Sequence, residues 1–387
     1  MIAYLTTQGA RLVREGQHLL LRKGGDIYHT LFIHKLEQVV VVGNVEITAP
    51  ALKLLLAHNI DTFWMRRDGR YLGRLVGAEP KNAFLRRKQF LLTQDEEFCL
   101  RVARAIVVGK MANMATLLAR IKRTRGDEKA AKAAKEVRGF IRKAHEAKIL
   151  DELRGYEGAA SLAYFAGLRR GFKHDWGFTR RVRRPPTDPV NSLLSLLYTF
   201  LMNRVYAAVR LAGLDPQPGT LHALEYSRYC LPLDLMEELR TIVVDTLVLG
   251  LLNLEVLKPD DFEQLKPPKP DAAPAPGLEA LIEAAAREGV GEADEAGVLA
   301  ETSDLPGPQT PPDAPEELPR DGKTAVVLTH QGMQKVIRAF EKKLATVFFH
   351  PVAQKKMSYA EAMVFQARAY RQVVEGQVPS YQPLLMK

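Results

Sequence analysis

An acidic side chain falls on the apolar face of a predicted helix, where it could bind a metal ion. In the segment ELRGYEGAASLAYF, residues three and four apart are neighbours, so Glu157 shares one face with Leu153, Ser161 and Tyr164. A buried carboxylate is costly unless it is paired or coordinates a metal. Two possibilities therefore stay open for Glu157, a metal ligand or a structural ion pair with an arginine.

More metal-binding chemistry lies in the segment LHALEYSRYCLPLDLMEELR. His222 falls in a connecting stretch, while Asp234 and Glu237 are three residues apart and face each other on the following helix. Adjacent carboxylates repel each other unless a cation lies between them. One imidazole with carboxylates suits Mg²⁺ or Mn²⁺ better than zinc, although an acidic helix face beside a histidine also occurs without a metal.

These side chains must be positioned by two regions of different hydrophobic periodicity. Residues 1–78 contain short apolar runs separated by turns, which predict a β-rich domain with a hairpin at Asp68-Gly69 and a short helix over Ala51–His58. Residues 79–258 and 320–387 have helical periodicity and predict an α-helical domain, which carries these candidate metal-binding side chains. The predicted fold class is therefore α+β.

Capping residues predict where the main helices begin. The predicted starts are a capping box at Thr93 to Glu96, the Asp188-Pro189 pair before a helix reaching Leu211, Pro232 before a helix over Leu233–Leu254, and Ser358 before a helix near the C-terminus.

The segment 259–319 differs from the rest in composition. It holds twelve of the 23 prolines and fifteen acidic residues against three basic ones, so it carries −12 while the remaining chain carries +22. Such a composition predicts a mostly disordered insertion, either a solvated spacer or an acidic mimic of DNA. A body this basic favours nucleic acid as the partner, with a merely basic enzyme as the alternative.

Three features predict a cytoplasmic protein with no membrane association. Cys99 and Cys230 lie far apart, which argues against a disulfide framework or a thiolate zinc site. The N-terminus lacks the apolar core of a signal peptide. The apolar run Ile242–Leu257 contains two acidic residues and is shorter than the roughly 20 residues that span a bilayer, so a buried helix is expected.

Four ordered segments resemble the signatures of the CRISPR-associated adaptation integrase, the larger of the two proteins shared by most CRISPR acquisition systems. They are RGYEGAASLAYF, RRPPTDPVNSLLSLLYTFL, GTLH and PLDLMEELRTIVVD. The N-terminal segment VVVVGNVEITAPALKLLLAHNIDTFWMRRDGRYLGRL is also similar to the family's β-domain. The resemblance covers nearly everything outside 259–319.

The resemblance implies a role for individual residues. Glu157, His222 and Glu237 match the family's catalytic metal ligands, and Asp234 matches an acidic position that supports the site. Glu238, Leu239 and Thr241 depart from the family's Pro, Phe and Pro, which raises the possibility that Glu238 competes as a ligand. Three further motif positions are expected near the site: Asn191, Tyr198 and Arg240.

The resemblance also implies a reaction and partners. In the family, a DNA 3′-hydroxyl attacks a phosphodiester of the CRISPR repeat in an Mg²⁺- or Mn²⁺-dependent transesterification that inserts a new spacer. A homodimer formed through the β-domains and assembly with the small CRISPR-associated protein two are expected. Two alternatives remain, a transposon-type integrase on the same fold and a catalytically inactive scaffold that binds branched DNA.

Basic stretches predict the DNA track, although such clusters are often only solvated faces. Tyr164 and Trp176 are candidates for stacking on unpaired bases, with a place in the core as the alternative. The predicted phosphate contacts are Arg66, Arg67, Arg70 and Arg74, then Arg86, Arg87 and Lys88, then Arg180, Arg181, Arg183 and Arg184.

Overall fold

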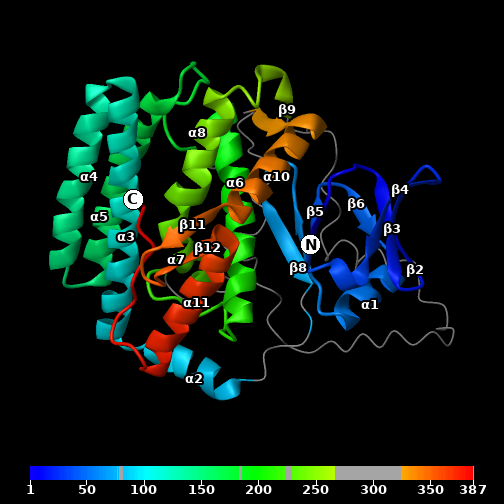
Figure 1. Cartoon of the computed structure of the whole chain (residues 1–387), viewed down its shortest axis with the longest axis horizontal. Coiled ribbons are helices and arrows are strands. Elements are labelled where there is room, and N and C mark those ends of the chain that lie inside the picture. Colours follow the sequence, from blue (N-terminus) through cyan, green and yellow to red (C-terminus); the bar gives the residue numbers. More distant parts are fainter. Residues whose placement is uncertain (76, 78–81, 183–184, 223–228, 266–323, 387) are drawn as a thin grey trace, which may run out of the picture. The chain divides into compact units, whose positions relative to one another are not determined.

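The computed structural model describes residues 1–75, 77, 82–182, 185–222, 229–265 and 324–386. Residues Met1–Gln264 and Ala325–Lys387 make up one compact unit, and Leu265–Thr324 are assigned to a second. The predicted acidic insertion from Lys266 onward lies outside the described residues. The α+β class is confirmed, with strands gathered in the N-terminal part and helices in most of the remainder (Figure 1).

Two four-stranded sheets form the N-terminal part, with the 3-10 helix η1 (Ile33–Lys35) and helix α1 (Ala49–Ala57) between strands. In the first sheet, β5 pairs in parallel with β1 and β7, and β8 is antiparallel to β7. The first sheet has the order β1 (Ile2–Leu5), β5 (Gln38–Val42), β7 (Asp61–Met65), β8 (Tyr71–Leu75), and the second β4 (Asp26–Phe32), β3 (His18–Lys23), β2 (Ala10–Glu15), β6 (Val45–Ile47). The predicted hairpin and short helix are confirmed.

Strand β5 separates two hydrophobic cores. Its four consecutive valines are all buried, as expected for a parallel strand covered on both faces. Because successive side chains point to opposite faces, Val39 and Val41 pack in a core of the N-terminal part, while Val40 and Val42 join the large core that the helices share.

Gly69 in the β7–β8 turn lies directly against helix α6 (Pro189–Leu211). Its φ is +88°, and a Cβ there would lie 2.8 Å from the Leu196 Cα. We therefore expect Gly69→Ala to lower the free energy of unfolding by about 2 kcal/mol or more, from left-handed strain and overpacking together. Chemical denaturation measures this. Gly73→Ala, at a strand position with open space around it, is the control and should be close to neutral.

The helical part is built around long helices whose ends differ in places from the predicted ones. Thr93 ends α2 by donating to the Phe90 carbonyl, and Asp95, rather than Thr93, caps α3 by accepting from Phe98 N. The predicted capping box is therefore wrong, whereas the Asp188 and Ser358 caps are confirmed. The helices are α2 (Ala83–Leu92), α3 (Glu96–Arg125), α4 (Glu128–Glu146), α5 (Leu150–Leu168), α6 (Pro189–Leu211), α7 (Cys230–Leu239), α8 (Thr246–Asn253), α10 (His330–Ala345) and α11 (Tyr359–Glu375), with a 3-10 turn η2 (Arg169–Gly171).

The predicted helix Leu233–Leu254 is three elements in the structure. Helix α7 begins at Cys230, so Pro232 lies inside its first turn, where the missing N–H removes no helical bond. A π-helical turn, η3 (Arg240–Asp245), then joins α7 to α8. Wide turns of this kind occur mostly at functional sites, because they change the direction in which side chains project.

The chain after α8 departs from the predicted insertion boundary. A 3-10 turn η4 (Pro259–Asp261) leads into β9 (Phe262–Leu265), which pairs with β10 (Ala325–Leu328). Asp261 binds Lys335 on α10 at 2.8 Å, which ties this segment to the folded body, so the boundary at 259 was wrong. A second strand pair, β11 (Val347–His350) with β12 (Lys355–Ser358), interrupts the predicted helical region.

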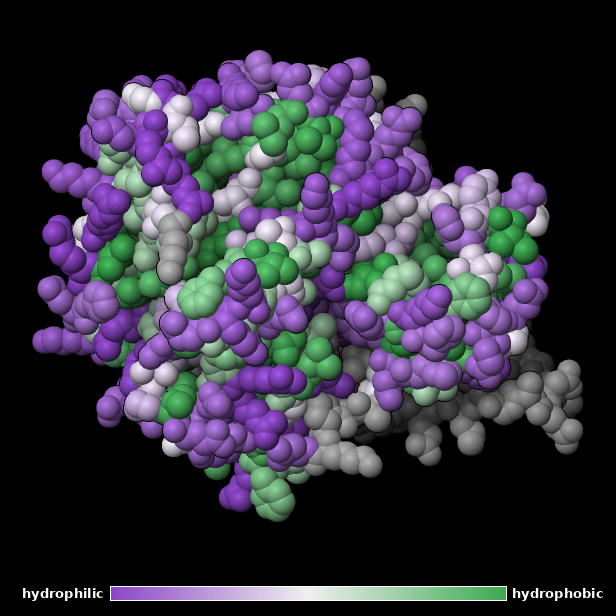
Figure 2. Space-filling view, viewed as in Figure 1, coloured by the Kyte–Doolittle hydropathy of each residue, from purple (hydrophilic) through white to green (hydrophobic). Residues whose placement is uncertain are grey.

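Helices α3 and α6 are long and apolar enough to cross a membrane by length and composition. In each, 67% of the apolar window is buried inside the fold, as in core helices of a soluble protein. Hydrophilic side chains predominate on the face in Figure 2, with apolar patches between them.

Candidate functional site

Three helices bring two glutamates and a lysine together. Glu157 comes from α5, Glu237 from α7 and Lys110 from α3. The Lys110 ammonium forms an ion pair with Glu157 and lies 2.6 Å from Oε2 of Glu237. Lys110 and Glu237 are both almost fully buried, so a single cation joins two carboxylates inside the protein.

Both glutamates are ionised at neutral pH because cations surround them. Burial alone would raise the pKa of Glu237, but Arg240 and Lys110 outweigh it and lower the pKa to about 2. Burial likewise raises the pKa of Glu157, but the Lys110 charge outweighs this effect and holds the pKa below its usual value. Arg240 contacts Glu237 Oε1 at 3.0 Å and stacks over the Tyr198 ring, 4.9 Å from its centroid.

Asp234 positions His222. It is fully buried and accepts from the backbone N–H groups of Thr220, Leu221 and His222, at 2.6, 2.9 and 3.1 Å. Its Oδ1 also lies 2.6 Å from His222 Nδ1. A carboxylate oxygen accepts here, so Nδ1 carries the hydrogen, and Nε2 is the ring nitrogen left to bind a ligand.

Two neighbours on α5 complete this arrangement. Arg154 donates to the Leu221 carbonyl at 2.9 and 2.7 Å, which holds the segment before His222. Ser161 donates to Glu157 Oε1 at 2.8 Å. Ser161 was expected on this face, and Arg154, three residues before Glu157, could have been found by the same helical spacing.

The π-helical turn η3 contains both Arg240 and Asp245, and it places Asp245 in contact with Tyr198. Asp245 accepts from Tyr198 at 2.6 Å and from Tyr164 at 2.5 Å. Tyr164 is fully buried, so its predicted stacking on DNA bases is wrong and its place in the core is confirmed. Trp176 is half-buried, and its ring packs 6.0 Å from the ring of Phe262.

The donor set suits a divalent metal, although it is not closed around one. The place held by the Lys110 ammonium shows that a cation fits between Glu157 and Glu237. His222 is the third candidate donor that the sequence offers. Within the described ranges, however, no three His, Cys, Asp or Glu side chains are grouped closely enough to hold a metal as they stand.

Glu238 points away from Glu237. Its carboxylate accepts from Gln366 Nε2 at 2.8 Å, from the Tyr381 hydroxyl at 2.9 Å and from Leu384 N at 2.9 Å. Glu238 therefore anchors the C-terminal segment and does not compete as a ligand. Burial raises its pKa to about 7, against the effect of these three donors.

This raised pKa makes a testable contribution to stability. The folded protein holds the Glu238 proton more tightly than the unfolded chain, so the contribution is fully present below the ordinary pKa of 4.5 and is lost as pH rises through about 7. We expect the difference in unfolding free energy between wild type and Glu238→Gln to fall by at most about 1.4 kcal/mol per pH unit in this window. Denaturant titrations from pH 4.5 to 8 measure it, and a flat difference would contradict it.

Asn191 binds residues of the loop before α6. It is fully buried at the start of α6, where it binds Asp188, the Arg180 carbonyl and Val182 N. Its side chain therefore orders the loop before α6. Arg181 bonds the Asn191 amide oxygen and Ser195, and its guanidinium lies 5.7 Å from the Tyr198 ring centroid.

The predicted DNA-contacting residues fall into different environments. Arg74 is a correction: its side chain is fully buried, binds Asp61 and Asn203, and stacks 3.4 Å from the Tyr206 ring centroid, so it cannot reach phosphate. Arg67 pairs with Glu263, and Arg86 with Asp215. Arg87, Lys88 and Arg180 are exposed, Arg66 and Arg70 are half-buried, and Arg183 and Arg184 lie outside the described residues.

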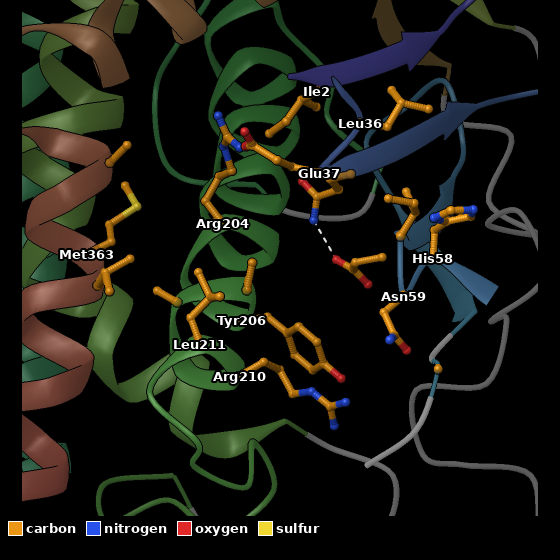
Figure 3. A pocket seen from close by; sticks show the side chains of 18 residues that line it. Ile2, Leu36, Glu37, His58, Asn59, Arg204, Tyr206, Arg210, Leu211 and Met363 are labelled. Atoms are coloured by element: carbon orange, nitrogen blue, oxygen red, sulfur yellow. Dashed lines mark hydrogen bonds between the residues drawn. The ribbon is translucent and has the colours of Figure 1, made fainter. Parts of the chain in front are cut away.

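A cavity of about 720 Å³ lies apart from this site, between the first sheet and helices α6 and α11 (Figure 3). Arg204, Tyr206 and Arg210 line it from α6, and His58 and Asn59 line it from the opposite side. Gln38 donates to Asp61 at 2.6 Å, and Arg74 pairs with the same carboxylate. No lining residue belongs to the Glu157 site, and the buried charge of Asp61 is already satisfied.

Comparison with known proteins assigns the chain to a class of CRISPR proteins. The family model described as "CRISPR associated protein Cas1" matches residues 3–268. The chain therefore belongs to the Cas1 family.

Individual relatives agree with this assignment. The chain is 36% identical over 273 residues to a protein of Rhodospirillum rubrum named "CRISPR-associated endonuclease Cas1 2", covering 68% of this chain and 78% of that protein. Its fold is similar to a chain titled "Casposase bound to integration product", with a TM-score of 0.74 at 16% identity over 98% of this chain and 92% of that one. It is also similar to a chain of a "Cas6-RT-Cas1--Cas2 complex", with a TM-score of 0.76 at 22% identity over 99% of this chain and 36% of that one.

Proposed function

We propose that this protein is a divalent-metal-dependent DNA endonuclease and integrase of CRISPR adaptation. The observation that carries the proposal is that half-buried Glu157 and buried Glu237 share one cation, while Asp234 holds Nδ1 of His222. Membership of a family with relatives named endonucleases supports the DNA chemistry. The proposed reaction is attack of a DNA 3′-hydroxyl on a phosphodiester of the CRISPR repeat.

Each residue of the site has a distinct part in the proposal. Glu157, Glu237 and His222 Nε2 would hold Mg²⁺ or Mn²⁺, which would lower the pKa of the attacking hydroxyl and stabilise charge on the phosphate. Asp234 keeps the hydrogen on Nδ1, so His222 acts as a ligand rather than a free base. Arg240 fixes the Glu237 carboxylate from the side of Tyr198.

The partners follow from the same proposal. The fold likeness to chains titled as a casposase with its integration product and as part of a Cas1–Cas2 complex supports DNA and the small CRISPR-associated protein two. The proposal also includes a homodimer formed through the N-terminal sheets and a cytoplasmic location. The casposase likeness also favours a second candidate, an integrase that inserts its own transposon. A CRISPR array beside the gene separates the two.

The metal chemistry is tested by an isosteric change. We expect Glu157→Gln to reduce strand transfer and cleavage of branched DNA by roughly a hundredfold or more, because it removes one anionic ligand. The assay compares Mn²⁺, Mg²⁺ and EDTA in the presence of the small partner. Glu136→Gln, an exposed position on α4, is the matched control. Wild type that binds the DNA but stays inactive with every metal would instead establish the inactive-scaffold alternative.

The exposed basic pair on α2 tests the DNA track. We expect Arg87→Gln with Lys88→Gln to reduce the slope of log affinity against log salt by about 1.8, because two phosphate contacts are lost. Binding to branched DNA is measured by fluorescence anisotropy at several salt concentrations. Lys355→Gln with Lys356→Gln removes the same charge from an exposed strand and controls for net charge. Equal slopes in the two variants would exclude a specific contact by α2.

A further inference from the structure

Lys110 is a buried cation that no motif predicted. It stands in the apolar run IVVGKMANM of α3, and its ammonium bridges Glu157 and Glu237. Lysine is almost never fully buried unless it is paired. Its position therefore coincides with the place that a shared metal ion would take in the proposed function.

The four side chains that pair with one another around Glu237 balance in charge without a metal. Glu157 and Glu237 carry two negative charges, and Lys110 and Arg240 carry two positive ones. Adding a divalent cation while both cationic side chains stay in place would add two positive charges to this balanced group, which is largely buried. Such an excess is costly, so metal binding must displace a cation, recruit anions, or do both.

Of the two cations, Lys110 is the one free to move. Arg240 is confined by Glu237 on one side and by the Tyr198 ring on the other. Lys110 has the two glutamates as its partners and carries its charge at the end of a flexible four-carbon stem. Rotation about that stem moves the ammonium by several ångströms without moving α3.

We propose that Lys110 is a positioning residue that holds Glu157 and Glu237 together in the metal-free protein and yields this place to a divalent cation. Its ammonium then pairs with a DNA phosphate. This inference rests on the proposed function and adds a regulatory consequence to it. Because phosphate compensates the added charge, metal and DNA each strengthen the binding of the other by the same factor.

The test is Mn²⁺ binding to the DNA-free protein, measured by the electron paramagnetic resonance signal of free Mn²⁺. We expect Lys110→Met to bind Mn²⁺ roughly tenfold more tightly than wild type or better, because the competing ammonium is gone. Branched DNA should tighten Mn²⁺ binding several-fold in wild type and much less in Lys110→Met. This pattern supports both halves of the proposal.

Controls separate displacement from a loss of folding. Lys110→Arg keeps the positive charge and should bind Mn²⁺ no more tightly than wild type. Lys122→Met removes an exposed lysine of α3, the helix that also carries Lys110. Lys122 pairs only with exposed Glu128 among the ion pairs described, so its loss should leave Mn²⁺ affinity unchanged. In EDTA, Lys110→Met should melt below wild type, and Mn²⁺ should raise its melting temperature by more than it raises that of wild type.

Two results overturn different claims. Mn²⁺ affinity in Lys110→Met that equals or falls below that of wild type overturns the displacement of Lys110 and leaves the proposed function standing. A wild-type protein that binds no Mn²⁺, with or without DNA, overturns the metal-dependent function together with this inference.

Discussion

Glu157 and Glu237 can lie close together inside the protein only while a cation lies between them, and the helical part is arranged around this constraint. One carboxylate comes from α5, the other from α7, and the cation from α3. Like charges in a region of low dielectric repel strongly, so each helix depends on the others for its electrostatic balance. The large core, which contains residues of all three helices, keeps these side chains in register.

The two ends of α7 extend this arrangement in opposite directions. From the first half of the helix, Asp234 accepts from the N–H groups of Thr220 to His222, which precede α7 in the chain, and orients the imidazole. After it, the π-helical turn carries Arg240 and Asp245, which bind Glu237 and Tyr198. One short helix therefore supplies two carboxylates with different partners. Asp234 accepts from His222, and Glu237, a candidate metal ligand, pairs with Arg240. This dense use of α7 explains why few of its side chains reach solvent.

Helical spacing predicted the site where it depends on neighbours within one element, and failed where the partner comes from elsewhere. The pairing of Glu157 with Ser161 follows from helical spacing. In β5, the division of four consecutive valines between two cores follows from the alternation of side chains along a strand. The roles of His222 and Glu237 came from family resemblance, since nothing in their own spacing joins them to Glu157. Lys110, the π-helical turn and the Asp61 partner of Arg74 depend on distant contacts. No local pattern distinguishes a buried arginine such as Arg74 from one on a DNA-binding face.

Glu237 and Glu238 show that adjacent residues of the same type can have different surroundings in the fold. The two residues are adjacent and chemically identical, yet cations lower the pKa of one to about 2, while burial raises that of the other to about 7. Successive residues on a helix project about 100° apart, so one carboxylate faces Lys110 and the other faces the C-terminal segment. Glu238, where the sequence departs from the family's proline, therefore adds no charge beside Lys110 and Glu237. Glu238 instead accepts hydrogen bonds from Tyr381 and Leu384. These bonds hold the C-terminal segment against α7, the helix that supplies Glu237.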